Sequence, residues 1–145
     1  MKHRVAALLA LLMLLPLAFA PPAFADDIAA GDKSAMQAIV SDQIAAFAHD
    51  DAAAAFAYAS PALHDVFRTP DTFMAMVKNG YGAIYRPRSV VFGDVETGAE
   101  GPVATVYVSG ADGEAYVALY SFQKQPDGSW KINGVRIVKD DSPTI

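Results

Sequence analysis

Residues 34–48 read SAMQAIVSDQIAAFA and open the stretch from Ser34 to Tyr85, around which we expect the fold to be organised. Ser34 and Gln37 have the spacing of a capping box, in which each side chain bonds an amide of the first helical turn. Apolar residues then recur at helical spacing along one face, namely Met36, Ile39, Val40, Ile44 and Phe47. Gln43 falls within the same face, so its amide must be hydrogen-bonded inside the protein or face a polar cavity.

Three short helices are predicted after the first one. Asp50 or Asp51 can cap a helix that begins with the alanine run at 52–55. Ser60-Pro61 and Thr69-Pro70 each pair an N-cap hydroxyl with a proline at the first helical position, so each predicts the start of another helix.

The apolar residues of the last two helices predict their buried sides. These residues are Leu63, Val66 and Phe67 in one helix and Phe73, Met76 and Val77 in the other. Asn79-Gly80 is expected to end the second of these helices in a left-handed turn, after which the chain becomes extended.

Beyond Val90 the residues become β-branched and aromatic, and glycine-rich turns interrupt them. The pattern predicts four antiparallel strands, at 89–97, 103–109, 114–124 and 129–138. In the last strand Val135 is out of phase with Ile132, which predicts a bulge at Asn133-Gly134. The expected fold is therefore α+β, with short N-terminal helices packed into a strongly curved antiparallel sheet of about four strands.

The two middle strands are apolar on both faces, since Tyr107 alternates with Val106 and Val108. A sheet with one solvated face should instead alternate apolar with polar residues. The second face therefore needs a cover, and we expect a homodimer that packs through the sheet faces.

The N-terminus opens with Lys-His-Arg and continues into a leucine and alanine run, which is typical of a secretory signal peptide. Ala23-Phe24-Ala25 predicts cleavage after Ala25, so that Asp26 starts a periplasmic or secreted chain. The alternative is an uncleaved membrane anchor, but Pro16 breaks the run, which is short of the roughly 20 residues that a bilayer span requires. The expected organisation is a signal peptide at 1–25, a flexible leader at 26–33, one domain at 34–138 and a frayed tail at 139–145.

The composition excludes several functions. Removing residues 1–25, which include Lys2 and Arg4, leaves nine basic against 16 acidic side chains, a net charge of −7. Such a chain lacks the clustered cations that nucleic-acid binding needs. It contains no cysteine, so it has neither disulfides nor thiol chemistry. Phosphate-loop, dinucleotide-binding and zinc-protease motifs are also absent, and we expect no cofactor.

Several segments carry a family resemblance across the chain from about Ala35 to Val138. They include Gln43-Ile44-Ala45-Ala46-Phe47, Tyr58-Ala59-Ser60-Pro61, Gly80-Tyr81, Tyr85-Arg86-Pro87 and Asp127-Gly128-Ser129-Trp130. In this order they resemble a bacterial exported family, the domain of unknown function 4864, within the wider nuclear-transport-factor-2-like superfamily. The resemblance implies helices laid into a curved sheet to form a cone. It implies no activity, because that superfamily includes isomerases, cyclases, dehydratases and non-catalytic binding modules.

Six side chains are candidates for ligand binding, namely Gln43, Tyr81, Tyr85, Arg86, Arg88 and Tyr120. Gln43 and the tyrosines could line the pocket of a cone, although core backbone could equally satisfy the Gln43 amide. Arg86 and Arg88 lie in the only locally basic stretch of an acidic chain, and either could hold a carboxylate or phosphate in a forked contact. Alternatively, these arginines pair with Asp94 or Glu96 on the first strand.

Two histidines are weaker candidates. His64 next to Asp65 could be an oriented base, but adjacent residues on a helix point about 100° apart, which favours a solvated surface. His49 near Asp50 offers metal-ligand types, but it lacks a third ligand at a suitable spacing, and a helix C-terminus already explains it. We expect no metal and identify no catalytic residue.

Three functions therefore stay open. The preferred one is a dimeric, exported module that binds a small hydrophobic or anionic ligand or a partner segment. The others are a cofactor-free acid–base isomerase or lyase and a structural interaction protein with a filled cone. A cleft lined by Gln43 and tyrosines would favour the first, and a perturbed carboxyl inside the cone would favour the second.

Overall fold

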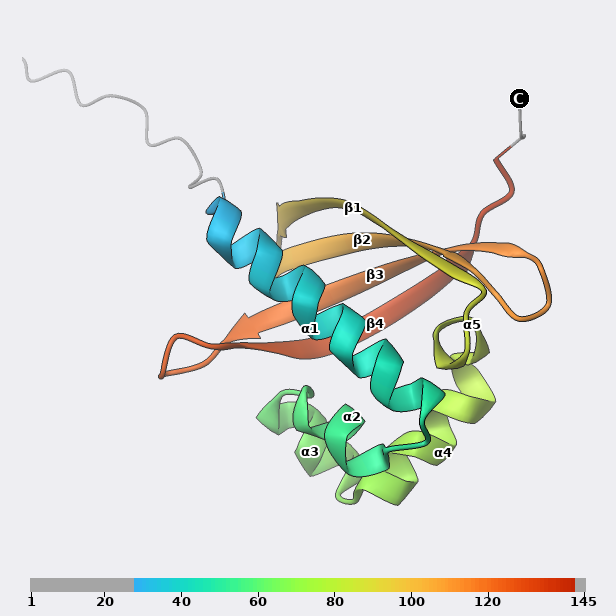
Figure 1. Cartoon of the computed structure of the whole chain (residues 1–145). Helices are drawn as coiled ribbons and strands as arrows, with labels where there is room; N and C mark the ends of the chain where they lie inside the picture. The colour runs from blue at the N-terminus through green and yellow to red at the C-terminus, as the bar shows by residue number, and fades with distance from the viewer. Residues whose placement is uncertain (1–27, 143–145) are drawn as a thin grey trace, which may run out of the picture.

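The computed structural model describes residues 28–142, which form five helices followed by a four-stranded sheet (Figure 1). The helices are α1 (Ala30–Ala48), α2 (Ala52–Ala57), α3 (Pro61–Phe67), α4 (Pro70–Gly80) and α5 (Gly82–Tyr85). The strands are β1 (Ser89–Gly98), β2 (Gly101–Ser109), β3 (Ala115–Lys124) and β4 (Trp130–Lys139). The α+β class is confirmed. The predicted signal peptide and its cleavage site lie outside the described residues.

The sheet is an antiparallel meander in the order β1-β2-β3-β4. Each strand agrees with its predicted range to within two residues. The bulge in β4 is also confirmed, because Ser121 pairs with Gly134 and Phe122 pairs with Ile132, which leaves Asn133 as the extra residue. A second irregularity in β1, between Phe92 and Val95, was not predicted.

The first helix begins earlier than the capping box predicts. α1 starts after Ala29, which makes no side-chain cap, and Ser34 lies inside the helix. The earlier start places Asp32 in the first turn, where its Oδ1 accepts a hydrogen bond from Trp130 Nε1 at 3.0 Å. An acidic residue there suits the helix dipole, and the bond ties the start of α1 to the start of β4.

Within residues 28–142, no helix is both long and apolar enough to cross a bilayer.

The caps of the next three helices are confirmed. The side chains of Asp51, Ser60 and Thr69 accept hydrogen bonds from the first turns of α2, α3 and α4 respectively. The predicted left-handed end of α4 is wrong, because Gly80 is still helical and does not have a positive φ. The chain does not become extended at this point either, since the single turn α5 follows.

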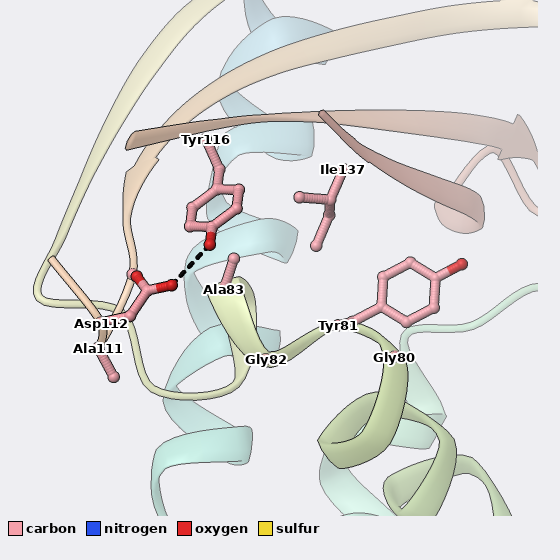
Figure 2. A pocket seen from close by; sticks show the side chains of 9 residues that line it. Gly80, Tyr81, Gly82, Ala83, Ala111, Asp112, Tyr116 and Ile137 are labelled. Atoms are coloured by element: carbon pink, nitrogen blue, oxygen red, sulfur yellow. Dashed lines mark hydrogen bonds between the residues drawn. The ribbon is translucent and has the colours of Figure 1, made fainter. Parts of the chain in front are cut away.

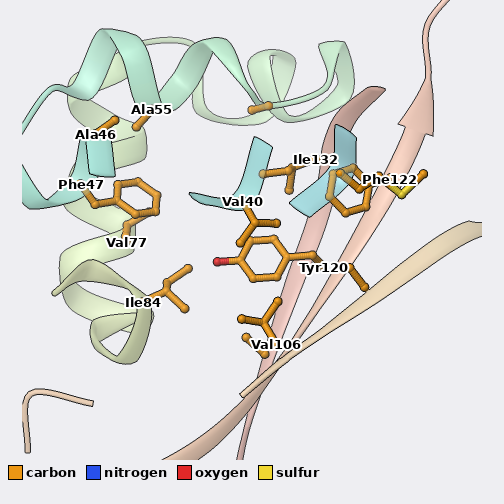
Figure 3. Close-up of a cluster of buried hydrophobic side chains, with 14 of the residues drawn as sticks. Val40, Ala46, Phe47, Ala55, Val77, Ile84, Val106, Tyr120, Phe122 and Ile132 are labelled. Carbon is orange, nitrogen blue, oxygen red and sulfur yellow. The ribbon is translucent and has the colours of Figure 1, made fainter. Parts of the chain in front are cut away.

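The core lies between the inner face of the sheet and the helices (Figure 3). Its largest fully buried side chains are aromatic and come from α1 and β3, namely Phe47, Tyr120 and Phe122. α4 buries Phe73, Met74 and Val77, whereas Met76 is only partly buried. The prediction for Val66 is wrong, because this α3 side chain is 68% exposed. The apolar side chains by which the short α3 packs on the core are Leu63 and Phe67.

The outer face of the sheet carries an exposed apolar row. Val91, Tyr107, Val117 and Val138 are paired in succession from β1 to β4, so they lie side by side. Val91 is 60% exposed, and Tyr107 and Val138 are each 47% exposed. The two middle strands thus have apolar residues on both faces, as their alternation predicts, and Val91 and Val138 extend the outer row to β1 and β4.

The end of the sheet extends slightly beyond the expected domain boundary. β4 continues to Lys139, and the backbone amide of Asp140 donates to the carbonyl oxygen of Ala115 at 2.8 Å. This part of the predicted tail is therefore held to β3. Residues 143–145 lie outside the described residues.

Candidate ligand-binding cleft

A cleft of about 160 Å³ opens between the helices and the inner face of β4, and we call it the helix–sheet cleft. α3 and α4 supply apolar walls, among them Leu63, Phe67 and Val77. Ile132 and Val135 line the sheet side. Of the described residues that line the cleft, none is charged, and Gln43 and Tyr81 supply its polar side chains.

Gln43 occupies the wall that α1 contributes. It is only 2% exposed, and its Nε2 donates a hydrogen bond to the carbonyl oxygen of Ala55 at 3.1 Å. No hydrogen bond to its Oε1 is recorded within residues 28–142. The sequence left a backbone-satisfied amide and a pocket-lining amide as alternatives, and the structure shows that Gln43 is both.

The bulge in β4 shapes the opposite wall. Ser60 Oγ donates to Asn133 Oδ1 at 2.7 Å, and the backbone amide of Ser60 donates to the carbonyl oxygen of Ile132 at 2.8 Å. The amide of Ile132 in turn donates to the carbonyl oxygen of Tyr58 at 2.8 Å. The segment before α3 is thus fixed to the edge of the sheet, and Gly134, just after the bulge, lies in the cleft wall.

Tyr81 lines both the helix–sheet cleft and a second, more open hollow of about 380 Å³, which Figure 2 shows. This hairpin hollow lies between the α4–α5 junction and the turn after β2. Its far side carries Asp112 and Tyr116, whose hydroxyl donates to Asp112 Oδ2 at 2.6 Å. The hydrogen bond lowers the pKa of Asp112 and raises the pKa of Tyr116. This pair was not predicted from the sequence, although the turn residues Asp112-Gly113 were a signal.

Tyr85 and Arg86 do not line the cleft, because both bind Asp50. The Tyr85 hydroxyl donates to Asp50 Oδ1, and Arg86 Nη2 donates to Asp50 Oδ2 at 2.8 Å. Lys78 Nζ lies 3.3 Å from the same carboxylate, and Lys78 and Arg86 flank the Tyr85 ring. The Tyr85 hydrogen bond and the two cations lower the pKa of Asp50. The alternative partners Asp94 and Glu96 are therefore wrong for Arg86.

Asp50 is the central residue of this cluster, although its sequence context indicated only a helix cap or a metal neighbour. Its φ of 53° places it in the left-handed region, which Asp tolerates better than most residues. That conformation turns the chain between α1 and α2. The cluster holds this turn against α4 and α5, so its role in the fold is structural.

Tyr120 is a core residue. Its side chain is fully buried, with the ring beside Val40 and Val106 and the hydroxyl pointing toward Ile84 (Figure 3). Its hydroxyl has no hydrogen-bond partner among the described residues. Burial raises the pKa of this phenol. Tyr120 pairs across the sheet with Val135, so it lies one strand away from the helix–sheet cleft.

The histidine candidates have structural contacts. His64 Nε2 lies 2.8 Å from the carbonyl oxygen of Phe56, and its ring stacks on the Phe56 ring at 3.8 Å. Since a carbonyl only accepts, this nitrogen must carry the proton. The other ring nitrogen, Nδ1, makes no hydrogen bond to Asp65 within residues 28–142, so the predicted orientation by Asp65 is not present. His49 is the C-cap of α1, and within residues 28–142 no group of three acidic or histidine side chains could hold a metal ion.

Arg88 lies apart from the cleft as well, beside a groove between α1 and β1 that Arg86 also lines. Of the six predicted ligand-binding residues, the structure thus brings only Gln43 and Tyr81 together in the helix–sheet cleft. The other cleft residues were predicted only as core, because a partly buried Leu or Phe gives the same sequence signal as a core residue.

Comparison with known proteins identifies the family of this chain. Neither the curated proteins nor the solved structures include a match to this chain. Residues 29–145 match the family described as "Domain of unknown function (DUF4864)". The match spans nearly all of the described fold, from the start of α1 to the end of β4. The chain therefore belongs to the DUF4864 family.

Proposed function

We propose that this protein is an exported binding module that holds a small uncharged molecule in the helix–sheet cleft. The observation that carries the proposal is the composition of the cleft, whose apolar walls surround one buried amide. Such a combination is typical of ligand sites, in which apolar surface supplies affinity and a few polar groups fix orientation. The arrangement of helices against an open, curved sheet supports the nuclear-transport-factor-2-like cone as its architecture.

The size of the cleft limits the ligand. An apolar cavity of about 150 Å³ is large enough to bind a benzene molecule. The helix–sheet cleft has a volume of about 160 Å³, so its ligand, or the inserted part of a larger one, is of similar size. A ligand with one hydroxyl or amino group could donate to Oε1 of Gln43.

The lining favours binding over acid–base catalysis. A cofactor-free isomerase or lyase needs a carboxyl or imidazole group close to its substrate. The described lining of the cleft includes neither, and Tyr81 is its titratable residue. The carboxylates whose pKa is lowered, including Asp50 and Asp112, lie outside this cleft.

A titration with p-cresol, followed by amide NMR shifts, tests the proposal. Leu63 lines the cleft, whereas Val66 on the same helix is exposed and points away from it. We expect p-cresol to shift the amides of Gln43 and Val135, Leu63→Trp to abolish binding by filling the cleft, and Val66→Trp to retain it. Absence of binding, or binding that Leu63→Trp leaves unchanged, would contradict the proposal.

We also propose export and dimerisation as parts of this function. Cleavage after Ala25 is tested by sequencing the N-terminus of the protein recovered from the periplasm, where Asp26 should come first. The exposed row of Val91, Tyr107 and Val138 supports a homodimer in which two sheet faces cover each other. Native mass spectrometry of the same preparation would measure the oligomer mass and a retained ligand together.

A further inference from the structure

A groove of about 570 Å³ lies between the outer flank of α1 and β1, and we call it the α1–β1 groove. Its walls are apolar along most of their length and include Ile44, Ala48, Val90 and Phe92. At one end the chain brings Arg86 and Arg88 to the rim. We propose that this groove binds an amphipathic anion, a molecule with an unbranched apolar chain and a single carboxylate.

The groove is separate from the helix–sheet cleft. At 100° per residue, Ile44 lies about 100° and Ala48 about 140° around α1 from Gln43. No described residue lines both sites. The new site therefore does not depend on the function proposed above.

Charge is the first reason to assign an anion. The chain as a whole is acidic, yet none of the described residues that line the groove carries a carboxylate. Both arginines come from the connection that leads from α5 into β1. Serine hydroxyls add further donors, because Ser41 and Ser89 also line the groove.

Arg88 is the arginine available to a ligand. Arg86 already donates to Asp50 at 2.8 Å. Arg88 has no carboxylate within 4 Å among residues 28–142, and its side chain is exposed. A guanidinium with no partner offers two parallel N–H donors that match the geometry of a carboxylate.

The length of the groove indicates how long the apolar chain of the ligand is. The wall from Ser41 to Ala48 covers eight residues of helix, so its ends lie seven rises of 1.5 Å, or about 10 Å, apart. This length suits a medium-length alkyl chain with its carboxylate at the arginine end. Octanoate is therefore a suitable probe, and 1-octanol and octyltrimethylammonium are matched probes that lack its negative charge.

The experiment is an NMR titration of the purified protein with each of the three probes. We expect octanoate to shift the amides of Ala48 and Val90 and to bind more tightly than either uncharged or cationic probe. Arg88→Gln should weaken octanoate binding by roughly fivefold, since the contact is an exposed charge pair. Arg136→Gln removes an exposed arginine of the outer sheet face and should leave the affinity unchanged.

A filling variant makes the test independent of charge. Ala48 is exposed at the end of α1, so Ala48→Trp can occupy the groove without entering the core. Octanoate binding should then be lost while the circular dichroism spectrum stays unchanged. Equal binding of 1-octanol, shifts confined to Gln43 and Val135, or full affinity in Arg88→Gln would overturn the proposal.

Discussion

The amide nitrogen of Gln43 donates to the carbonyl oxygen of Ala55 across 3.1 Å, which joins α1 to α2 beneath the helix–sheet cleft. This bond fixes the only buried amide side chain of the described cleft lining. Gln43→Met should lower the free energy of unfolding by about 1–2 kcal/mol, because it removes a buried hydrogen bond and leaves the Ala55 carbonyl with only the 3.4 Å bond from the Tyr58 amide. Urea unfolding measures this loss.

The matched control for Gln43 is Gln37→Met, which changes a glutamine earlier in α1 for which no side-chain hydrogen bond is recorded within the described residues. This change should alter stability by less than about 0.5 kcal/mol. Equal effects of the two substitutions would show that the bond to Ala55 contributes nothing specific.

The hydroxyl of Tyr120 offers a second test, because it is buried without a partner in the described structure. Tyr120→Phe should raise the free energy of unfolding by about 1 kcal/mol, since it removes a desolvated polar group and retains the ring. Tyr116→Phe is the contrasting variant, because its hydroxyl is bonded to Asp112 and its removal should not stabilise the protein. A large loss of stability in Tyr120→Phe would indicate that the hydroxyl has a partner in solution.

Ser60 both caps α3 and contacts the bulge, whereas Thr69 caps α4 and otherwise bonds only Thr72 in the same turn. Ser60→Ala should cost about 2 kcal/mol, the sum of a cap and a buried hydrogen bond to Asn133. Thr69→Ala should cost about 1 kcal/mol. Thermal and urea unfolding measure both losses of unfolding free energy, and the difference between them gives the contribution of the hydrogen bond between Ser60 and Asn133. Similar losses in the two variants would argue against that contribution.

Tyr107 lies in the middle of the apolar row on the outer sheet face. If two copies cover this face, Tyr107→Glu should convert a dimer to a monomer, because it places two like charges in an apolar contact. Light scattering at micromolar concentration reads the mass directly. Ala62→Glu adds the same charge at an exposed position of α3 and should remain dimeric. A wild-type protein of monomer mass would refute the dimer.

The lowered pKa of Asp50 predicts that the folded protein loses free energy of unfolding in acid. Because its pKa is lowered from 3.8 in the folded protein, its contribution is complete above that value and is lost as the pH falls through the lower folded pKa. Asp50→Asn should therefore flatten the dependence of unfolding free energy on pH below about pH 4. Denaturant titrations between neutral pH and pH 3 measure the slope. An unchanged slope would show that the cluster around Asp50 does not persist in solution.

The sequence predicts the strands better than the start of the first helix, for a physical reason. Strand ends follow from local alternation and turn residues, so all four strands and the bulge at Asn133 could be placed. The start of α1 is coupled to the bond between Asp32 and Trp130, which lie 98 residues apart. No local capping rule includes such a contact.

The residues of the candidate site also differ in how well the sequence predicts their positions. Gln43 could be found because an amide breaks an otherwise apolar helical face. Tyr85 and Arg86 were assigned to the pocket because they lie in the only locally basic stretch, which also carries tyrosines, but α5 turns them toward Asp50. Tyr120 was predicted to be one of several pocket tyrosines. Strand alternation shows that its side chain faces inward, but it does not show how deeply the side chain is buried.

The bonds that connect Tyr58 and Ser60 to Ile132 also protect the sheet against strand addition. β4 is an outer strand, and its backbone groups at Ile132 would otherwise be open to pairing with another chain. The opposite edge, β1, is interrupted by its irregularity and carries exposed Asp94 and Glu96. Both edges thus discourage growth into fibrils.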